Sequence, residues 1–390
     1  MVYRSGVMFL VSFLVLGVST AGASAEDGVF KDRIVFGQVA ALDGPAQALG
    51  KGMREGILAA FDEANRDGGV HGRKLELKSV DDGYEPDKTI DAIKKILSED
   101  KVFALVGPVG TPTSKAGQPI ATDAKVPFIG PFTGAEFLRD PYNRYIVNVR
   151  SSYYQETESW IERLTKDLGF SRIAILYQDD AFGLAGLEGV KRAMAKRNMS
   201  LVSMGSFKRN TTAVKSALLD IMKAEPQAVV TVGPYKPIAE FIKLARQASM
   251  DTVFVAISFV GPDALAQELG DKGDGVIVSQ VVPFPGDTSI PVVASYHAAL
   301  APTNGKPGFV SLEGYLVGRL VVETLKRISG EPTREAFLDV IAKNGSFDLG
   351  GIRLSYGPGK NQGMDQVFFT ILQADGSFKP VTQLTKRVGQ

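Results

Sequence analysis

The chain has 390 residues, with 44 Lys and Arg against 43 Asp and Glu, and no cysteine. The missing cysteines exclude disulfides, zinc–thiolate sites and thiol nucleophiles. Balanced charge without a basic stripe argues against nucleic acid or an anionic membrane surface as a partner.

Residues 1–25 have the pattern of a secretory signal peptide. Arg4 is the only charged residue, Val7–Val18 is a short apolar run, and Ala23-Ser24-Ala25 is a small-residue cleavage site. No later stretch is apolar for long enough to cross a bilayer, and no cysteine follows the apolar run to carry a lipid. We therefore expect a mature chain that starts near Glu26 and is exported to the periplasm of a Gram-negative bacterium.

The mature chain of about 365 residues is too long for one ordinary core and suits two domains. Short apolar runs alternate with amphipathic stretches, which predicts parallel sheets covered by helices on both faces. The expected strands are Arg33–Val39, Lys74–Val80, Val102–Val106, Val126–Gly130, Tyr145–Val149, Arg172–Tyr177, Ser200–Phe207, Ala228–Val232, Val253–Ile257 and Val276–Ser279. The expected helices are Gly52–Asn65, Asp87–Ser98, Lys115–Asp123, Thr157–Leu168, Phe182–Arg197, Val214–Lys223, Ile238–Ala248, Val292–Leu300 and Leu312–Ile328, and a hairpin joins Gln366–Gln373 to Phe378–Val381.

Two such series indicate an α/β fold with two doubly wound parallel-sheet lobes joined by a hinge of three strands. The first lobe would contain residues 26–149 and 285–347, and the second would contain residues 150–284 and 348–390. The chain is expected to cross between them near Val149–Ser152, near Val281–Pro285 and around Phe347–Tyr356.

A glycine-rich loop, Gly107–Ser114, lies between an expected strand and an expected helix. Thr111 is a good N-cap, and Pro112 suits the first helical position. Free backbone N–H groups, a hydroxyl and the positive end of a helix dipole would hold a small anion, a carboxylate above all.

A second loop, Pro131–Glu136, follows the next strand, and its Thr133 and Glu136 have capping-box spacing. The simpler interpretation is that Thr111 and Thr133 only cap helices. Loops at the ends of successive parallel strands lie side by side, however, which favours a ligand cleft.

These features together resemble the type I periplasmic solute-binding proteins of ABC importers, in the Leu/Ile/Val-binding branch, over essentially the whole mature chain. The features that carry the resemblance are Asp43-Gly44-Pro45, Gly68–Leu75, Asp81-Asp82 with Pro86, the Gly107–Ser114 loop, and Phe132-Thr133-Gly134-Ala135. The resemblance implies a two-lobed clamp that closes on a small ligand.

The resemblance also assigns ligand-binding residues. Thr111, Thr113, Phe132, Thr133 and Gly134 of the first lobe would bind the ligand carboxylate and its neighbouring atoms. Three further residues would contact the rest of the ligand, namely Phe182 and Tyr235 of the second lobe and Leu49, which stands where relatives often present an aromatic residue. The alternatives are a core role for Phe182, a helix start at Tyr235 and a loop anchor at Leu49.

One departure from the family bears on the ligand. Amino-acid binders of this family usually have a carboxylate for the ligand ammonium after the strand matched by Val253–Ile257, where this chain has Ser258-Phe259-Val260-Gly261. Asp263 is the nearest acid and is expected inside the next helix. A buried ammonium without a partner is costly.

Two interpretations of this departure stay open. Either another acid serves, with Glu156, Asp179 and Asp180 as candidates, or the ligand is an aromatic or aliphatic carboxylic acid without an ammonium group. For such an acid, Phe132, Phe182, Tyr235 and Phe259 would line an apolar pocket. Arg150 near the hinge is a further candidate for the carboxylate, or a hinge brace.

Enzyme motifs are incomplete. Gly50–Gly56 departs from the dinucleotide fingerprint because its last glycine comes one residue late, and Gly44–Lys51 has five residues between glycines where a Walker A loop has four. The two histidines, His71 and His297, are far apart, and no Gly-x-Ser-x-Gly elbow occurs. Asp81-Asp82 suits capping or salt bridging better than a metal, so we expect no catalytic activity, no metal and no cofactor.

The sequence therefore predicts a monomeric protein that captures a small carboxylate-bearing solute by hinge closure and delivers it to an ABC permease in the inner membrane. The family resemblance implies that this solute is an amino acid of the branched-chain type. Two alternatives come from other classes. One is a sensor that presents the ligand to a chemoreceptor or kinase through the same clamp, and the other is a hydrolase or transferase on a similar α/β scaffold.

Overall fold

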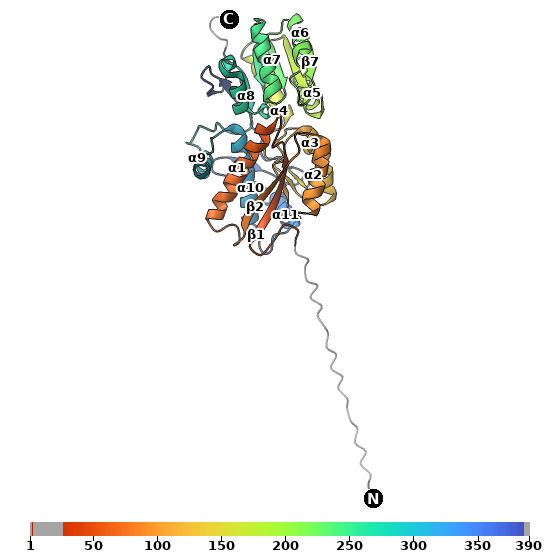
Figure 1. Ribbon diagram of the computed structural model, residues 1–390, viewed down its shortest axis with the longest axis vertical. Coiled ribbons are helices and arrows are strands. Elements are labelled where there is room, and N and C mark those ends of the chain that lie inside the picture. Colours follow the sequence, from red (N-terminus) through yellow and green to blue (C-terminus); the bar gives the residue numbers. More distant parts are fainter. Residues whose placement is uncertain (1, 3–25, 386–390) are drawn as a thin grey trace.

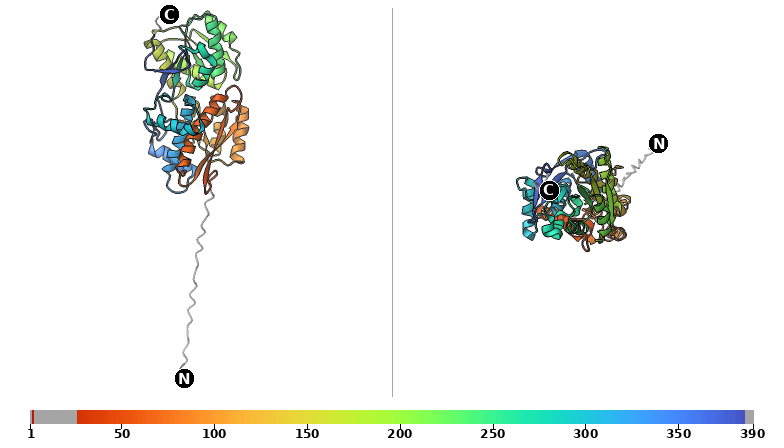
Figure 2. Two further views of the ribbon diagram at one scale, coloured as in Figure 1. Left: turned by 60° about the vertical axis from the view of Figure 1, so that its left-hand side comes forward. Right: turned by 90° about the horizontal axis from the view of Figure 1, so that it is seen from above.

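The computed structural model describes residue 2 and residues 26–385. They form two α/β lobes that follow one another along the long axis of the molecule (Figure 1, Figure 2). The expected signal peptide lies outside the described residues, residue 2 excepted. No helix of the described part of the chain is both long and apolar enough to span a membrane.

The first lobe is a parallel sheet in the order β2-β1-β3-β4-β5. Its strands are β1 (Arg33–Ala40), β2 (Lys74–Asp81), β3 (Leu105–Val106), β4 (Phe128–Ile129) and β5 (Ile146–Val147). Its helices are α1 (Gln47–Arg66), α2 (Pro86–Ser98), α3 (Thr111–Asp123), η1 (Glu136–Leu138), α9 (Pro291–Leu300), η4 (Ala301–Thr303), α10 (Phe309–Lys326) and α11 (Arg334–Asn344). Figure 1 shows α1 and α10 on one face of this sheet and α2 and α3 on the other.

Burial of both faces explains the apolar run of β1. Ile34 and Phe36 belong to the core cluster that includes α1 and α10, while Val35 and Val39 belong to the cluster under α2 and α3. A strand covered on both faces must be apolar at successive positions, as parallel sheets require.

The second lobe has a seven-stranded sheet in the order β14-β13-β10-β9-β8-β6-β7. Its strands are β6 (Ile173–Gln178), β7 (Ser203–Phe207), β8 (Ala228–Val232), β9 (Val253–Ala256), β10 (Ile277–Gln280), β13 (Phe368–Leu372) and β14 (Phe378–Val381). Its helices are α4 (Tyr153–Lys166), α5 (Ala181–Ala195), α6 (Lys215–Lys223), α7 (Tyr235–Gln247), η2 (Ser258–Val260), α8 (Pro262–Leu269) and η3 (Gly270–Gly273). The expected C-terminal hairpin is confirmed, because β13 and β14 pair antiparallel at the sheet edge.

Two glycines bring α1 and α10 into close contact. A Cβ atom at Gly56 would stand 1.9 Å from the carbonyl oxygen of Ser311, and one at Gly314 would stand 2.4 Å from that of Met53. This packing fixes α10, which comes late in the chain, onto the first lobe.

A small antiparallel sheet, β11 (Ser346–Asp348) with β12 (Arg353–Ser355), stands apart from both large sheets. The hydroxyl of Tyr356 donates to the carbonyl oxygen of Asn148 at 3.0 Å, and the N–H of Asn148 donates to Asn361 at 2.7 Å. Ser151 then donates to the carbonyl oxygen of Gln366 at 2.6 Å. These contacts favour a third crossing between Asn361 and Gln366, after the range expected from the sequence.

Two expected caps are not formed. Gly110, with φ at 109°, holds the N-cap position of α3, and Thr111 is the first helical residue without a capping side-chain bond. Thr133 accepts from the N–H of Ala135 at 3.2 Å, and Ala135 precedes the short helix η1, so no capping box joins Thr133 to Glu136. Both hydroxyls are thereby left for other contacts.

Candidate functional site

The two threonine hydroxyls of the first lobe meet. Their loops run side by side, since the N–H of Phe132 donates to the carbonyl oxygen of Pro108 at 2.7 Å. The Oγ1 atoms of Thr111 and Thr133 are 2.6 Å apart, and both residues are fully buried. The expectation that these loops lie together at one sheet edge is confirmed.

Thr113 and Gly134 make other contacts. The hydroxyl of Thr113 donates to the carbonyl oxygen of Val109 at 2.5 Å, on its own helix turn. Gly134 accepts from the N–H of Tyr153 at 2.7 Å, and a Cβ atom there would stand 2.6 Å from the Tyr153 ring. Gly134 is therefore needed for the close approach of α4 to the loop.

Aromatic rings from both lobes fill the space between them. Phe259 of the second lobe lies at centre-to-centre distances of 4.5 Å from Phe182, 5.3 Å from Phe132 and 6.0 Å from Tyr84. The ring of Phe182 also lies 5.4 Å from that of Tyr153. We call these five residues the aromatic cluster.

Leu49 and Tyr235 form a second contact between the lobes. The hydroxyl of Tyr235 accepts from the N–H of Ala48 at 3.4 Å, and a Cβ atom at Gly261 would stand 2.6 Å from the Leu49 side chain. Both Leu49 and Tyr235 are buried. They lie at the lobe interface as the resemblance requires, and their role toward a ligand stays a prediction.

The Tyr153 hydroxyl lies among polar groups of the cleft. Burial raises the pKa of Tyr153, whereas Arg150 and the hydroxyls of Thr133 and Thr111 act in the opposite direction. These groups are thus close in space, yet the Tyr153 hydroxyl makes no hydrogen bond of ordinary geometry with any residue that the structure describes.

Arg150 is held by Glu313 of α10. Its Nε and Nη2 atoms donate to the two carboxylate oxygens of Glu313 at 2.8 and 2.7 Å, and its Cζ lies 4.3 Å from the centre of the Phe132 ring. Burial acts to lower the pKa of Arg150, but the Glu313 carboxylate outweighs burial, so the pKa lies above its ordinary value. The guanidinium is charged at every physiological pH.

Glu156 of α4 is fully buried and already has several donors. Its carboxylate accepts from the N–H and the hydroxyl of Ser258, at 3.0 and 2.8 Å, and from the hydroxyl of Ser279 at 2.6 Å. Burial raises the pKa of Glu156, although Arg150 and these hydrogen bonds oppose the rise. Ser258, which stands where the resemblance leads us to expect a carboxylate, thus contacts a carboxylate from another element.

The other acids considered for an ammonium are occupied or exposed. Asp179 is exposed. Asp180 caps α5 by accepting from the N–H of Phe182 at 2.9 Å and pairs with Arg209. Asp263 accepts from the N–H of Phe309 at 3.0 Å, which links α8 to α10.

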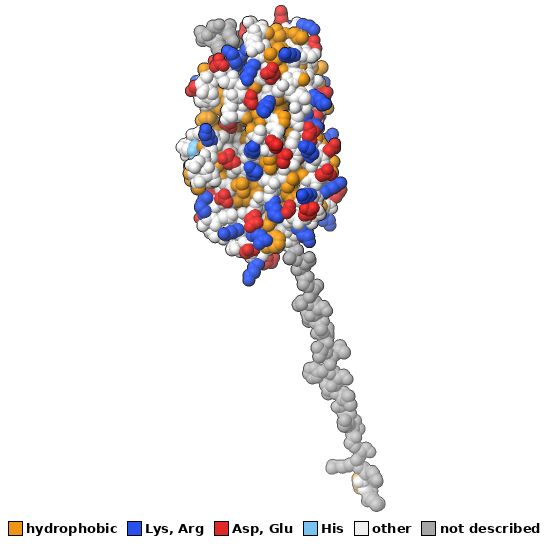
Figure 3. All heavy atoms as spheres, in the orientation of Figure 1, with side chains coloured by type: hydrophobic (Ala, Val, Ile, Leu, Met, Phe, Trp, Pro, Cys, Tyr) orange, Lys and Arg blue, Asp and Glu red, His pale blue; other side chains and the backbone are white. Residues whose placement is uncertain are grey.

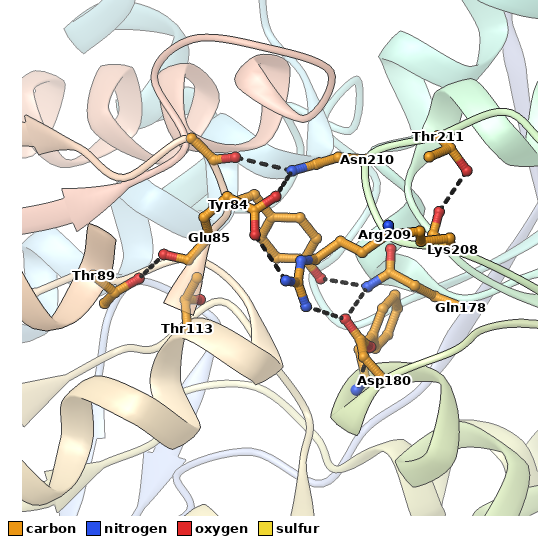
Figure 4. A network of polar contacts seen from close by, with 12 residues as sticks. Tyr84, Glu85, Thr89, Thr113, Gln178, Asp180, Lys208, Arg209, Asn210 and Thr211 are labelled. Atoms are coloured by element: carbon orange, nitrogen blue, oxygen red, sulfur yellow. Dashed lines mark hydrogen bonds and ion pairs between the residues drawn. The ribbon is translucent and has the colours of Figure 1, made fainter. Parts of the chain in front are cut away.

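A polar network crosses the cleft beside the aromatic cluster (Figure 4). Arg209 of the second lobe donates to Glu85 of the first lobe at 2.7 Å and to Asp180 of its own lobe at 3.0 Å. Asn210 donates to Glu85 at 2.7 Å, and Gln178 donates to the hydroxyl of Tyr84 at 3.3 Å. We call these residues the interlobe network, and it holds the lobes in a closed arrangement.

The closed arrangement leaves little free volume. A cavity of about 10 Å³ lies against Phe132, Arg150, Ser258, Gln280 and Glu313. This volume is about the minimum for one water molecule. A solute therefore has to enter while the lobes or the rings are apart.

Sequence reasoning missed Tyr84, Tyr153, Gln178 and the interlobe network. Tyr84 adopts a left-handed φ of 62° directly after Gly83, and its position after Asp81-Asp82 at a strand end was a usable signal. Tyr153 is the first residue of α4, next to the predicted hinge, and could have been found there. Arg209 and Asn210 follow a strand in a polar loop whose partners depend on the lobe arrangement.

The family model described as periplasmic binding protein matches residues 33–377. The chain belongs to the periplasmic binding protein family. Together with the relatives described below, this match confirms the resemblance to type I proteins and the two-lobed α/β fold. It also places the chain, at the family level, among solute-binding proteins.

Solved structures of similar proteins agree over nearly the whole chain. A possible leucine/isoleucine/valine-binding protein from Rhodopirellula baltica is 37% identical, with a TM-score of 0.86, over 92% of this chain and 98% of that chain. A substrate-binding periplasmic protein from Ralstonia solanacearum is 25% identical, with a TM-score of 0.84, over 89% of this chain and 99% of that one.

Among curated proteins, the Leu/Ile/Val-binding protein BraC3 of Rhizobium johnstonii is 26% identical over 60% of this chain. The match spans 62% of that protein's length, just under two thirds.

The described residues include no group of three or more His, Asp or Glu side chains placed to hold a metal ion. On the face drawn in Figure 3, basic and acidic side chains are interspersed over both lobes.

Proposed function

We propose that this protein captures a small carboxylate-bearing solute between its lobes and delivers it to an ABC permease. The observation that carries the proposal is the buried hydroxyl pair of Thr111 and Thr133, which the first lobe places beside an aromatic cluster contributed by both lobes. Hydroxyl and backbone donors suit a carboxylate, and the rings suit an apolar side chain.

The relatives support an amino acid of the branched-chain type as the solute. The Rhodopirellula and Rhizobium proteins are both described as Leu/Ile/Val-binding, the first as a possible one. We assign the carboxylate to Thr111 and Thr133, and the side chain to Phe132, Phe182 and Phe259. Leu49 and Tyr235 would close the pocket, while Thr113 and Gly134 shape the two loops.

The mechanism is hinge closure. Only the closed form contacts a solute from both lobes, so binding favours closure. The moving units are the two lobes, with crossings near residues 149–152, 281–285 and 361–366. The permease would then recognise the closed outer surface.

Location follows from the family and the N-terminal pattern. We propose that residues 1–25 are removed on export and that the mature protein acts in the periplasm. A solute carrier of this kind binds and releases its ligand unchanged, so no catalytic role is assigned to its residues.

A second candidate ligand is a carboxylic acid without an ammonium group. The observation that favours it is Glu156, whose carboxylate already accepts from Ser258 and Ser279. Asp180 is paired to Arg209 and Asp263 is bonded to α10, so neither carboxylate is free for an ammonium group.

Small-angle X-ray scattering of residues 26–390 tests the proposal. Leucine, isoleucine, valine, 4-methylpentanoate and 3-phenylpropionate are added separately at saturation. We expect at least one of these carboxylates to reduce the radius of gyration. Binding without compaction would contradict the clamp mechanism, and no effect from any compound would contradict the proposed solute class.

A further inference from the structure

We infer that Arg150 is a specificity-determining residue, whose free Nη1 atom donates a hydrogen bond to an oxygen of the ligand's carboxylate. The inference rests on the proposed function and names a contact beyond the two threonine hydroxyls.

The geometry of the guanidinium leaves one donor group unused. Nε and Nη2 form a two-point contact with the Glu313 carboxylate. The third guanidinium nitrogen, Nη1, is buried and has no hydrogen-bond partner among the described residues. Arg150 is 1% exposed. A buried donor without an acceptor is rare and costs free energy in a native protein, so an acceptor is expected there.

The Arg150 side chain borders the cleft between the lobes. Arg150 stacks on the ring of Phe132, which directly precedes Thr133 in the chain and packs against Phe259 across the cleft. Arg150 also lines the small cavity together with Ser258 and Gln280. A ligand that enters the cleft would therefore lie beside the Arg150 guanidinium.

The Tyr153 hydroxyl adjoins the same groups. It is buried without a hydrogen bond of ordinary geometry among the described residues, and the Arg150 guanidinium and the hydroxyls of Thr133 and Thr111 lie close enough to oppose the rise of its pKa. The free Nη1 atom and these three hydroxyls form a donor-rich site. A carboxylate has about four acceptor positions and matches it.

Glu313 sets the strength of the contact. Because its carboxylate compensates the charge of Arg150, Nη1 offers a charge-assisted donor without an uncompensated buried cation. The expected contribution is then that of one strong hydrogen bond. A single water in the small cavity is the competing explanation for the free donor.

Binding constants of matched acid and amide pairs test the inference. Titration calorimetry on residues 26–390 would use leucine and leucinamide, valine and valinamide, 4-methylpentanoate and its amide, and 3-phenylpropionate and its amide. The single variant is Arg150→Gln. The double variant combines Arg150→Gln with Glu313→Gln, so that both charges of the pair are removed together and the site stays neutral. Arg319→Gln is the control, since Arg319 contacts Glu63 and Tyr315 on α1 and α10.

We expect the double variant to unfold at the parent's temperature, to bind the acids about tenfold or more weakly and to bind the amides nearly unchanged. If the ratio of acid affinity to amide affinity were the same in the parent and in the folded double variant, the inference would be overturned. Arg150 would then be a hinge brace. If the parent bound none of the acids, the proposed function itself would fall. A crystal structure of the parent with a bound acid and a water on Nη1 would also overturn the inference.

Discussion

At the scale of single residues, the hydroxyls of Thr111 and Thr133 are the groups on which the proposed carboxylate site depends. They are buried and bonded to each other, so one donor proton is free for a ligand. Replacing either residue by valine keeps the shape and removes a donor.

We expect Thr111→Val and Thr133→Val each to weaken leucine or 4-methylpentanoate binding by about 1–3 kcal/mol, the cost of leaving a charged acceptor short of one donor. Titration calorimetry gives the dissociation constants. Thr324→Val is the matched control, because Thr324 is a buried threonine that donates only to the carbonyl oxygen of Leu320 in α10. Parent-like affinity in both cleft variants would place the carboxylate elsewhere.

Asp82 makes stability depend on pH. It is fully buried, accepts from the N–H of Tyr84 and the hydroxyl of Thr89, both at 2.9 Å, and burial raises its pKa to about 6. A carboxyl group with a raised pKa favours the folded state when protonated. Its contribution is therefore present below about pH 4 and is lost as the pH rises through about 6.

Between pH 4 and pH 7 the parent should lose up to about 3 kcal/mol of unfolding free energy relative to Asp82→Asn, since each pKa unit corresponds to about 1.4 kcal/mol. Urea unfolding at both pH values measures the difference. Asp271→Asn, at an exposed position in η3, is the control. A constant difference between parent and variant would contradict the assignment.

The positions of side chains could be predicted from the sequence where the loop that carries them is positioned by the end of a strand. Thr111, Phe132 and Thr133 follow strand ends, so their proximity follows from the parallel sheet alone. Tyr153 and Arg209 depend on how the lobes face each other, and no local pattern carries that information. The hydroxyl of Thr113 donates to the carbonyl oxygen of Val109, four residues earlier in the chain, so it is bonded within its own segment.

At the scale of elements, the contact of α1 with α10 ties the late part of the chain to the first lobe. Gly56→Ala would put a methyl group 1.9 Å from the carbonyl oxygen of Ser311. We expect the variant to lose about 1–3 kcal/mol of unfolding free energy by overpacking.

Chemical unfolding measures the loss. Gly357→Ala is the control, because a Cβ atom there meets nothing within 4 Å, and its effect should stay within about 0.5 kcal/mol. Equal unfolding free energies of the two variants would contradict the importance of close packing between α1 and α10.

The interlobe network is the element that holds the lobes closed. Arg209→Ala should weaken ligand binding several-fold, by about 1 kcal/mol, because partly exposed ion pairs contribute little more than this. The effect should shrink at high salt, which screens the pair. Arg192→Ala is the matched control, since Arg192 pairs with Glu188 inside α5. An equal effect of both variants on the dissociation constant would contradict a closing role.

Most elements were predictable from periodicity. The β13–β14 hairpin and most helices lie close to their expected positions, because burial on two faces and turn residues mark them locally. α11 was missed, although Thr333 caps it by accepting from the N–H of Ala336 at 3.1 Å. The small sheet of β11 and β12 was missed because its strands are short and lie where a crossing was expected.

At the scale of the whole molecule, the protein is a clamp whose lobes meet through apolar and polar contacts. The apolar contacts are the aromatic cluster and the packing of Leu49 beside Tyr235. The polar contacts include the interlobe network, the pair of Arg150 with Glu313 and the bond from α10 to Asp263. The rings exclude water, and the polar contacts define the closed geometry. A solute that replaces part of the ring contacts then links both lobes, which is the condition for ligand-driven closure.

The measurement that tests the central claim most directly is a thermal-shift screen of residues 26–390. The panel is leucine, isoleucine, valine, 4-methylpentanoate, benzoate and 3-phenylpropionate. A ligand at 100 times its dissociation constant adds about 2.7 kcal/mol to the unfolding free energy, which is readily seen. We predict that at least one of the three branched-chain amino acids raises the unfolding temperature. A shift only with acids that lack an amino group would move the assignment to the second candidate, and no shift with any carboxylate would contradict the account.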